Sequence, residues 1–262
     1  MHIHAFDVFG AHPGTGNPAL VVEHDAFDAA GRLQFACERG LTCVFLDAQA
    51  GTVDYWYPHQ RSPLCVHATL AAAAVLFARH DGAGAVGVST AMRGQRLDLL
   101  REDDACYVAL QPQAAPDAVI PPAVLRHLLG VPDLAPVMPP RVASVGSPKL
   151  LVEVADVATL YALAPDLAAI SAWGRAQGVN GLYVYCRLGP GHYEGRNFNH
   201  LERHLEDSAT GVAAGALTVL LGHGLDLRQG RATGRDCLIR TRIDGDRILV
   251  GGAVRNDSMK NA

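Results

Sequence analysis

Two segments of this chain are predicted to form helices that are apolar on every side. The first covers about Leu64–Arg79, and the second covers about Thr210–His223 and is rich in Ala and Gly. A helix that is apolar all round must be buried all round. Many short strand-like segments, separated by turns that contain Gly, precede and follow both helices. The pattern favours an α+β fold in which strands wrap around each of two central helices.

The starts of the two apolar helices are similar to each other. Aligning Ala68-Thr69 with Ala209-Thr210 places the two starts 141 residues apart, about half of the 262-residue chain. This spacing indicates a duplicated domain, although two unrelated buried helices that share small residues would give the same short match.

A segment rich in Pro and Ala, Gln111–Pro140, separates the two halves of the chain and contains one short predicted helix, Pro122–Leu129. Such a composition is typical of a domain linker. We therefore expect an N-terminal half over residues 1–115 and a C-terminal half over residues 116–262. The last strand of the chain could pack back on the first half.

Composition narrows the class of protein. Apolar residues make up 49% of the chain and charged residues 18%, which is typical of a globular domain, and the formal net charge of -4 argues against nucleic-acid or anionic-membrane partners. The longest apolar run, Ala68–Ala78, is too short to cross a membrane. The N-terminus lacks a secretory signal, so we expect a cytoplasmic protein whose six scattered cysteines are free thiols.

Nine short motifs follow one another along the chain. They are Asp7-Val-Phe-Gly10, Gly16-Asn-Pro-Ala-Leu-Val-Val22, Trp56-Tyr-Pro58, Pro63-Leu-Cys-Val-His-Ala-Thr-Leu-Ala-Ala72, Ser144-Val-Gly-Ser-Pro-Lys-Leu150, Ala164-Pro-Asp-Leu167, Asn180-Gly-Leu-Tyr183, Arg196-Asn-Phe198 and Glu206-Asp-Ser-Ala-Thr-Gly211. Their joint order and spacing resemble the phenazine-biosynthesis PhzF-like family, which shares the diaminopimelate epimerase fold. Two of them resemble the family patterns C-G-H-A-T-L-A-A and R-x-F…E-D-P-x-T-G.

The resemblance implies two pseudo-symmetric diaminopimelate epimerase-like domains, each a barrel-like β-sheet around a central helix, with the active site in the cleft between them. It also implies proton transfer without a cofactor or metal, and a homodimer. Family members include an isomerase of a dihydro-hydroxyanthranilate and relatives in alkylproline antibiotic pathways. We therefore expect an isomerase of secondary metabolism that moves a proton and a double bond on a small substrate with a carboxylate, either amino-acid-like or cyclic.

The starts of the two apolar helices are the candidate binding sites. Helix N-termini expose unpaired backbone N–H groups and a partial positive charge, which suit a carboxylate, and small residues there let the backbone approach it. Thr69 is expected to cap its own helix instead. The candidate substrate-binding residues are Asn17, Cys65, Val66, Ala209, Thr210, Gly211, Val212 and His200.

Asp207 and His67 match, by the resemblance, the acidic residue and the histidine of the family's active site. A histidine can hold or shuttle a proton near neutral pH. A carboxylate close to a helix start could instead be an ordinary cap, and a single histidine is often structural. We predict that both residues are catalytic.

The family's catalytic glutamate, in a pattern like S-E-T-x-F, has no counterpart in the region Ala36–Leu46. An ungapped alignment puts Cys43 at its position, and a gapped one puts Leu41 there. Glu38 would have to leave a helix to take that place. Cys43 is therefore a candidate base, because positive helix ends would lower the pKa of a thiol, although free Cys is also a common small core residue.

Cys65 lies directly before the first apolar helix. In the epimerase branch a catalytic thiol occupies this kind of position, but family members that use the glutamate also have Cys here. A racemase with two thiols would need a second Cys at the start of the second helix, where this chain has Ser208.

Two further departures from the family pattern concern the substrate. Val66 replaces a Gly, which narrows the approach to the helix start. The segment Asn199–His204 replaces a family stretch of S-P-x-x-G character and brings His200, Arg203 and His204 near Asp207. The two histidines are four residues apart and could share a helix face, but no third metal ligand is evident. Altered substrate recognition and a solvated loop are the other interpretations.

Three functions therefore remain open. The first is the isomerase with Cys43, His67 and Asp207 as catalytic residues. The second is an amino-acid racemase or epimerase that uses Cys43 or Cys65 with Asp207. The third is a binding protein that retained the site and lost the catalytic base.

Overall fold

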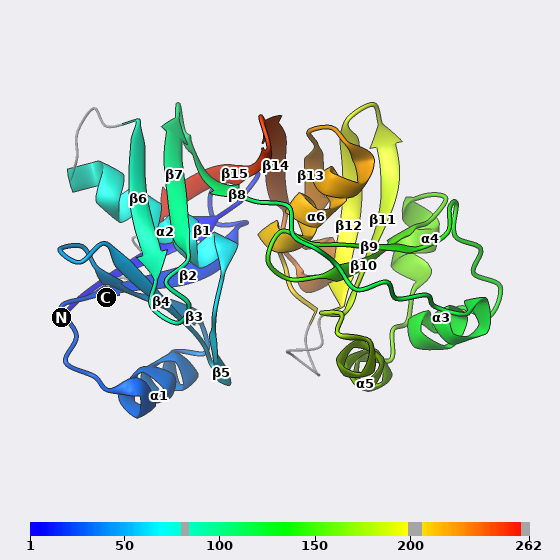
Figure 1. Ribbon diagram of the computed structural model, residues 1–262, viewed down its shortest axis with the longest axis horizontal. Coiled ribbons are helices and arrows are strands. Elements are labelled where there is room, and N and C mark those ends of the chain that lie inside the picture. Colours follow the sequence, from blue (N-terminus) through cyan, green and yellow to red (C-terminus); the bar gives the residue numbers. More distant parts are fainter. Residues whose placement is uncertain (80–83, 199–205, 258–262) are drawn as a thin grey trace. The chain divides into compact units, whose positions relative to one another are not determined.

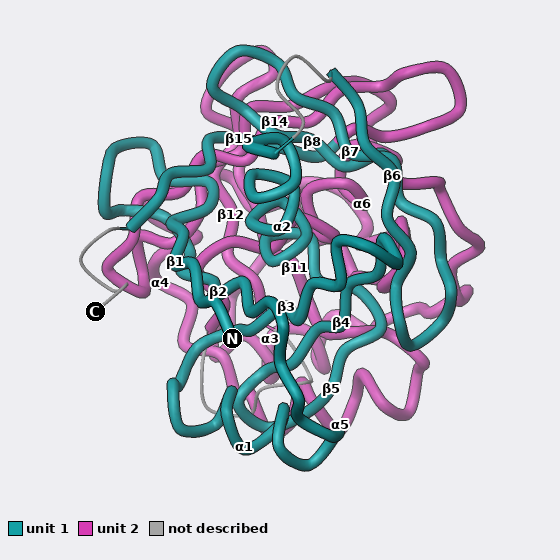
Figure 2. Tube along the Cα trace, turned by 90° about the vertical axis from the view of Figure 1, so that its left-hand side faces the viewer, with its two compact units in different colours: residues 1–109, 250–262 teal, residues 110–249 magenta. Residues whose placement is uncertain are grey.

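The computed structural model describes residues 1–79, 84–198 and 206–257, and the chain divides into two compact units (Figures 1 and 2). The first unit comprises residues 1–109 together with the C-terminal segment from Val250 onward, and the second comprises residues 110–249. Each unit contains one of the two apolar helices.

The strands of the first unit form a closed barrel of eight. Their hydrogen-bonded order is β1-β2-β3-β4-β6-β7-β8-β15, and β1 also pairs with β15 in antiparallel fashion, which closes the ring. The short β5 pairs only with β4. The bounds are β1 His2–Val8, β2 Asn17–Glu23, β3 Thr42–Asp47, β4 Thr52–Tyr57, β5 Gln60–Ser62, β6 Ala85–Thr90, β7 Arg96–Glu102, β8 Ala105–Leu110 and β15 Arg247–Asn256.

Helix α2 (Val66–Arg79) lies inside this barrel, surrounded by strands in the view of Figure 2. It contacts β1, β2, β3, β4, β6 and β7, and between Val66 and Phe77 every residue except the half-buried Ala74 is buried. Ala at positions 71–74 gives this helix a narrow cross-section, so that strands can approach it closely from several directions. The other helix of this unit, α1 (Ala29–Arg39), buries only one face. Asp28 caps its start, and Gly40, at φ 60°, ends it.

The second unit has a sheet of order β14-β13-β12-β11-β10-β9. Helix α6 (Gly211–Leu221) packs against β14, β9 and β10 and is buried over most of its length. The other elements are β9 Arg141–Ala143, β10 Lys149–Glu153, β11 Leu182–Gly189, β12 His192–Phe198, β13 Asp226–Gln229, β14 Cys237–Asp244, α3 Pro122–Leu129, α4 Val157–Ala162, α5 Leu167–Gln177 and a 3-10 turn Arg231–Thr233.

The two units repeat one pairing pattern. In both, successive neighbours pair antiparallel, parallel, antiparallel, parallel and antiparallel, along β1-β2-β3-β4-β6-β7 in one and β9-β10-β11-β12-β13-β14 in the other. The buried helix follows the fourth strand of the series in each case, α2 after β4 and α6 after β12. The fold predicted from the sequence, a sheet wrapped around a central helix in each half, is confirmed.

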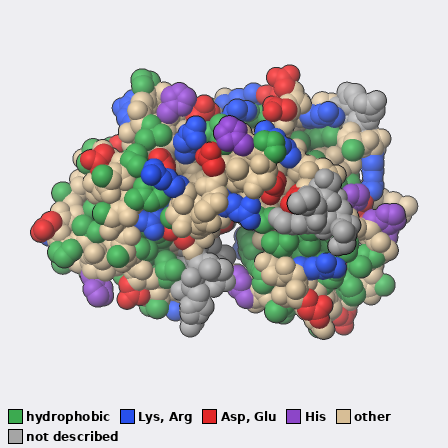
Figure 3. All heavy atoms as spheres, turned by 180° about the vertical axis from the view of Figure 1, so that it is seen from behind, with side chains coloured by type: hydrophobic (Ala, Val, Ile, Leu, Met, Phe, Trp, Pro, Cys, Tyr) green, Lys and Arg blue, Asp and Glu red, His purple; other side chains and the backbone are tan. Residues whose placement is uncertain are grey.

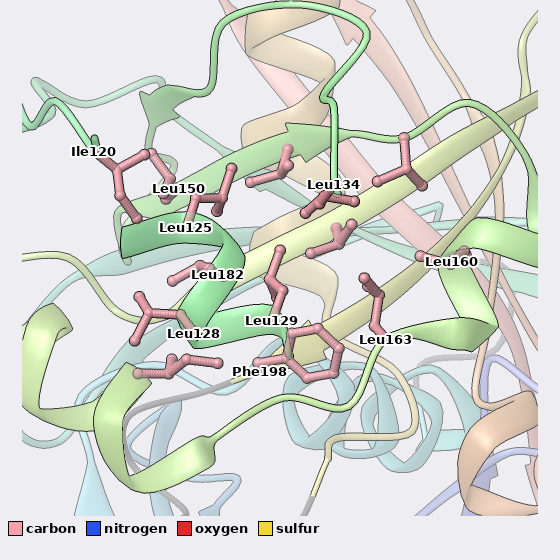
Figure 4. Packing of buried hydrophobic residues seen from close by; sticks show 14 of the residues in the cluster. Ile120, Leu125, Leu128, Leu129, Leu134, Leu150, Leu160, Leu163, Leu182 and Phe198 are labelled. Atoms are coloured by element: carbon pink, nitrogen blue, oxygen red, sulfur yellow. The ribbon is translucent and has the colours of Figure 1, made fainter. Parts of the chain in front are cut away.

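The opposite face of the second sheet carries a large apolar cluster. Leu128 and Leu129 of α3 pack onto Leu182 and Phe198 of the sheet (Figure 4). Helix α3 covers the residues predicted for it, and its leucines are buried. Much of the expected linker, residues 111–140, is therefore part of a core.

Strand β13 ends at Gln229, because Gly230, at φ 107°, breaks the extended backbone, and a 3-10 turn follows. Strand β12 was not expected from its sequence, His-Tyr-Glu-Gly-Arg-Asn-Phe.

None of the helices in the described ranges is long and apolar enough to span a membrane. On the face shown in Figure 3, acidic and basic side chains are interspersed among apolar ones.

Candidate active site

Helix α2 begins with a close thiol–imidazole pair. Cys65 immediately precedes the first helical residue, Val66, and its Sγ lies 3.4 Å from Nδ1 of His67. Cys65, Val66 and His67 are all buried. The two side chains are therefore within reach for one proton to be shared between sulphur and nitrogen.

The surroundings of Cys65 favour the thiolate. Burial on its own raises the pKa of this thiol, but the charge and hydrogen bond of His67 oppose it, together with hydrogen bonds from the Tyr57 side chain and the Ala68 backbone N–H. These stabilising contacts outweigh burial, so the pKa of Cys65 lies below its ordinary value. Thiols at helix N-termini and beside imidazolium groups are the reactive ones in proteins.

Thr69 holds the backbone of Cys65 in place. Its Oγ1 donates to the Cys65 carbonyl at 2.7 Å and accepts from the Tyr55 hydroxyl at 2.6 Å. Thr69 is fully buried, so this chain of hydrogen bonds links the helix start to β4. The expected helix cap is not formed, because Thr69 lies within the first turn of α2 and its hydroxyl donates to a carbonyl instead of accepting from a backbone N–H.

Cys43 lies in an apolar environment on β3. It is fully buried in a cluster with Leu20, Phe45 and Trp56, and its Sγ is 3.6 Å from the Leu41 carbonyl. Burial raises the pKa of Cys43 to about 12, although the charge of Arg39 lowers it slightly. A thiol in this state remains protonated near neutral pH, so of the two candidate cysteines the geometry favours Cys65 as the base.

Asn17 and Val66, two of the candidate substrate-binding residues, lie at the start of a strand and at the start of a helix, respectively. Asn17 is the first residue of β2, half-buried and opposite Val8 of β1. Val66 is the first residue of α2, between Cys65 and His67 in the sequence, and is buried.

Helix α6 begins with a second polar cluster, centred on Asp207. Thr210, the N-cap, donates from Oγ1 to Asp207 Oδ2 at 2.5 Å. Gln229 accepts from the Thr210 backbone N–H at 3.2 Å and donates to the Asp207 carbonyl at 2.7 Å. Asp207 is half-buried, whereas Gln229 is 2% exposed. One amide side chain thus fixes both the helix start and the loop that carries Asp207.

The other residues predicted at this helix start lie around the cluster. Ala209 and Gly211 are buried and Val212 is half-buried. Ser208, at the position where a racemase with two thiols would have Cys, shares a 2.8 Å hydrogen bond with Thr233.

An ion pair anchors the loop before α6. Arg196 donates to the Glu206 carboxylate at 2.8 and 3.0 Å and to the carbonyls of Leu160 and Leu163. Both partners are largely shielded from solvent. The motif R-x-F…E therefore orients the backbone that presents Asp207.

Three of the residues in question, His200, Arg203 and His204, lie outside the described ranges. In the parts of the chain that the structure describes, no group of three His, Cys, Asp or Glu residues could hold a metal ion. Sequence reasoning missed Tyr57, Gln229 and Lys149. They lie on strands β4, β13 and β10, outside the motifs at the two helix starts, and a sequence motif shows only neighbours along the chain.

A barrel-like sheet around a buried helix, repeated in two units, defines the diaminopimelate epimerase type of fold. The family model of phenazine biosynthesis-like proteins matches residues 6–256, and the chain belongs to this family.

Relatives of this chain are named as isomerases. The chain is 30% identical to "Uncharacterized isomerase YddE" of Escherichia coli O157:H7, over 96% of this chain and 94% of that one. It is also 30% identical to the trans-2,3-dihydro-3-hydroxyanthranilate isomerase of Pseudomonas aeruginosa, over 91% and 89%. A solved structure titled as a "Predicted Epimerase" from Pseudomonas aeruginosa superposes with a TM-score of 0.78 at 25% identity, covering 97% and 96%. The expected family and the isomerase class of enzyme are confirmed.

The thiolate of Cys65 should be visible in an ultraviolet titration. Thiolates absorb near 240 nm, and the wild type minus Cys65→Ser difference should titrate at a lower pH than an ordinary thiol, because His67, Tyr57 and Ala68 stabilise the charge. The matched Cys43→Ser difference should show no such step below about pH 10, in line with the raised pKa of Cys43. A Cys65 step above the ordinary value would contradict the arrangement described here.

Proposed function

We propose that this protein is a cofactor-independent isomerase that moves a proton, and with it a double bond, on a small cyclic or amino-acid-like carboxylate. The observation that carries the proposal is the Cys65–His67 pair at the start of α2, 3.4 Å apart and buried. It supplies a base suited to removing a proton from carbon, in a chain whose family glutamate is missing.

In the proposed reaction the Cys65 thiolate removes a proton from a carbon of the substrate. The C–H bond breaks, an S–H bond forms, and the released electron pair becomes a new C=C bond. The electron pair of the old C=C bond takes up a proton at its far carbon, so that the substrate keeps its composition. His67 stabilises the thiolate before the step, and Asp207 holds or delivers a proton in the same reaction.

The start of α6 supports binding of a carboxylate in this scheme. Ala209 and Gly211 are small, so their side chains do not shield the backbone at this helix start, and N–H groups at a helix start favour negative charge. The Thr210 N–H is already used by Gln229, so the N–H groups that follow it are the candidates for substrate contact. A pathway of the phenazine or alkylproline type would supply such substrates.

A second candidate is an epimerase that removes and returns a proton at one carbon. The activated Cys65 favours it, as does the similarity to a structure titled as an epimerase. Because Ser208 stands at the second helix start, the second acid–base group would be Asp207 rather than another thiol.

Incubation in D₂O separates these candidates. We expect trans-2,3-dihydro-3-hydroxyanthranilate, proline or a pyrroline carboxylate to gain one deuterium, measured by mass spectrometry and proton NMR, with heat-inactivated protein as the control. Deuterium with a shifted double bond identifies the isomerase, and deuterium at the α-carbon with loss of optical rotation identifies the epimerase. Binding of these carboxylates without any exchange would contradict both and leave the binding protein.

A further inference from the structure

Two fully buried polar side chains near Asp207 have no role in the reaction proposed above. They are Lys149 at the start of β10 and Asn197 on β12, both with 0% of their surface exposed. Within the described ranges, Nζ of Lys149 and both polar atoms of the Asn197 side chain lack a hydrogen-bond partner. Burying such groups unpaired is costly, and an ammonium group costs more than an amide.

Both side chains lie on the face of the sheet that α6 covers. Leu150 and Val152 of β10 belong to the apolar cluster on the opposite face, shown by Leu150, Leu182 and Phe198 in Figure 4. Since side chains alternate along a strand, Lys149 is directed to the α6 side, where α6 packs against β10. By the same alternation Asn197, next to Phe198, is also on that side.

Asp207 joins these two residues to the helix start. Its backbone forms an isolated antiparallel bridge with Asn197, and the negative charge of its carboxylate raises the pKa of Lys149. Tyr183 lies opposite Asn197 in the β11–β12 pair and donates to Gln229, which also holds the Thr210 N–H. Asn197 is therefore a backbone neighbour of Asp207, and Lys149 lies on the same side of the sheet, close enough for the Asp207 carboxylate to act on its charge.

We propose that Lys149 is a positioning residue of the proposed reaction: it supplies the counter-charge that lets one helix start hold both a carboxylate side chain and an anionic substrate. Without that counter-charge the Asp207 carboxylate would repel a substrate carboxylate at the same helix start. The inference rests on the proposed function, because it assumes an anionic substrate.

The choice of lysine has a consequence for pH. Of the 22 basic residues only Lys149 and Lys260 are lysines, and arginine could not lose its proton. Burial lowers the pKa of Lys149 to about 7, although the Asp207 carboxylate raises it in part. The counter-charge is therefore present below about pH 7 and lost above it.

Within the described ranges, Asp207 is the one charged group next to Lys149. Helix α6 contains no titratable residue. Burial raises the pKa of Tyr183 on β11 well above its ordinary range, so this phenol stays neutral. Arg141 on β9 is exposed to solvent. Glu206, which precedes α6, forms an ion pair with Arg196.

The test is NMR of protein labelled with ¹³Cε-lysine, which shows two lysine signals. The signal that Lys149→Met removes should titrate near pH 7, and the signal that remains belongs to Lys260. In Asp207→Asn the Lys149 signal should titrate at lower pH, because the stabilising carboxylate is gone. Arg141→Met, which removes an exposed cation from the adjacent strand, should leave it unmoved.

Kinetics of deuterium exchange supply the functional readout. In the wild type KM for an anionic substrate should rise about tenfold as pH passes through the Lys149 titration, with kcat less affected. Lys149→Met should have the high KM at every pH, and Lys149→Arg should restore the low KM and abolish the pH step.

Several outcomes would overturn the assignment. They are a Lys149 signal that titrates near the ordinary lysine value of about 10.4, a Lys149 titration unmoved in Asp207→Asn, or a KM without a step near pH 7. The first two are measured without activity and in folded wild type or Asp207→Asn, so poor folding of a Lys149 variant does not block the test. Absence of exchange in the wild type would instead overturn the proposed function.

Discussion

Replacing Cys65 with alanine is expected to lower the rate of solvent deuterium exchange by about 10²–10⁴-fold, the contribution of a positioned base. The thiolate at the start of α2 is stabilised by His67, Tyr57 and the Ala68 N–H. Alanine leaves these contacts without the charge they stabilise. KM should change little, since the effect lies in the proton-transfer step. Rates of deuterium incorporation in single turnovers measure the loss directly.

Cys43→Ala is the matched control for this experiment. Both cysteines are buried in the first unit, but Cys43 lies in an apolar cluster and its pKa is raised to about 12. We expect Cys43→Ala to keep the exchange rate within a few-fold and to lose about 1 kcal/mol or more of stability through the vacated volume. The opposite pattern, in which Cys43→Ala is inactive and Cys65→Ala is active, would return the role of base to Cys43.

The comparison of the two thiols shows what the sequence could and could not reveal. The spacing of Cys65 and His67, two residues apart at a helix start, is visible in the sequence. Whether burial or stabilising contacts control the charge of a thiol depends on groups from other strands, such as Tyr57 of β4. An alignment to the family's missing glutamate therefore pointed to Cys43, and only the fold distinguishes the two cysteines.

The fold itself was accessible because its two central helices carry an unmistakable pattern. A helix of Ala, Gly and Leu with no polar face has to be surrounded, and this condition alone predicts a wrapped sheet in each half. Strand β12 was missed for the converse reason. Its buried Glu194, Arg196 and Asn197 lack the alternation of apolar and polar residues that identifies a strand. Glu194 accepts a hydrogen bond from Tyr161, Arg196 forms an ion pair with Glu206, and the backbone of Asn197 bridges to Asp207.

The irregular strand and the candidate site are therefore connected. Polar residues in a sheet interior weaken the sequence signal for the strand, and they are retained where a site needs fixed polar groups. Gln229 at the end of β13 and Lys149 at the start of β10 follow the same rule, each buried and each directed to the Asp207 cluster. In this chain, the buried polar residues that obscure the strand pattern of the second unit are therefore the first targets for mutation.

Asp207→Asn is expected to lower the exchange rate by about 10²–10⁴-fold as well. Asparagine preserves the shape of the side chain and can still accept the hydrogen bond from Thr210, so the helix start should remain intact. What it cannot do is take up and deliver a proton. Ser208→Ala, one residue along, removes only the hydrogen bond to Thr233 and should keep the rate within a few-fold.

The double variant Cys65→Ala/Asp207→Asn decides whether the two groups serve one reaction. Residues that act as a unit in catalysis lose activity non-additively, so the double variant should be about as slow as the slower single variant. A loss equal to the product of the two single losses would show that Cys65 and Asp207 contribute independently. Full activity in Asp207→Asn would remove Asp207 from the mechanism and with it the need for a counter-charge at Lys149.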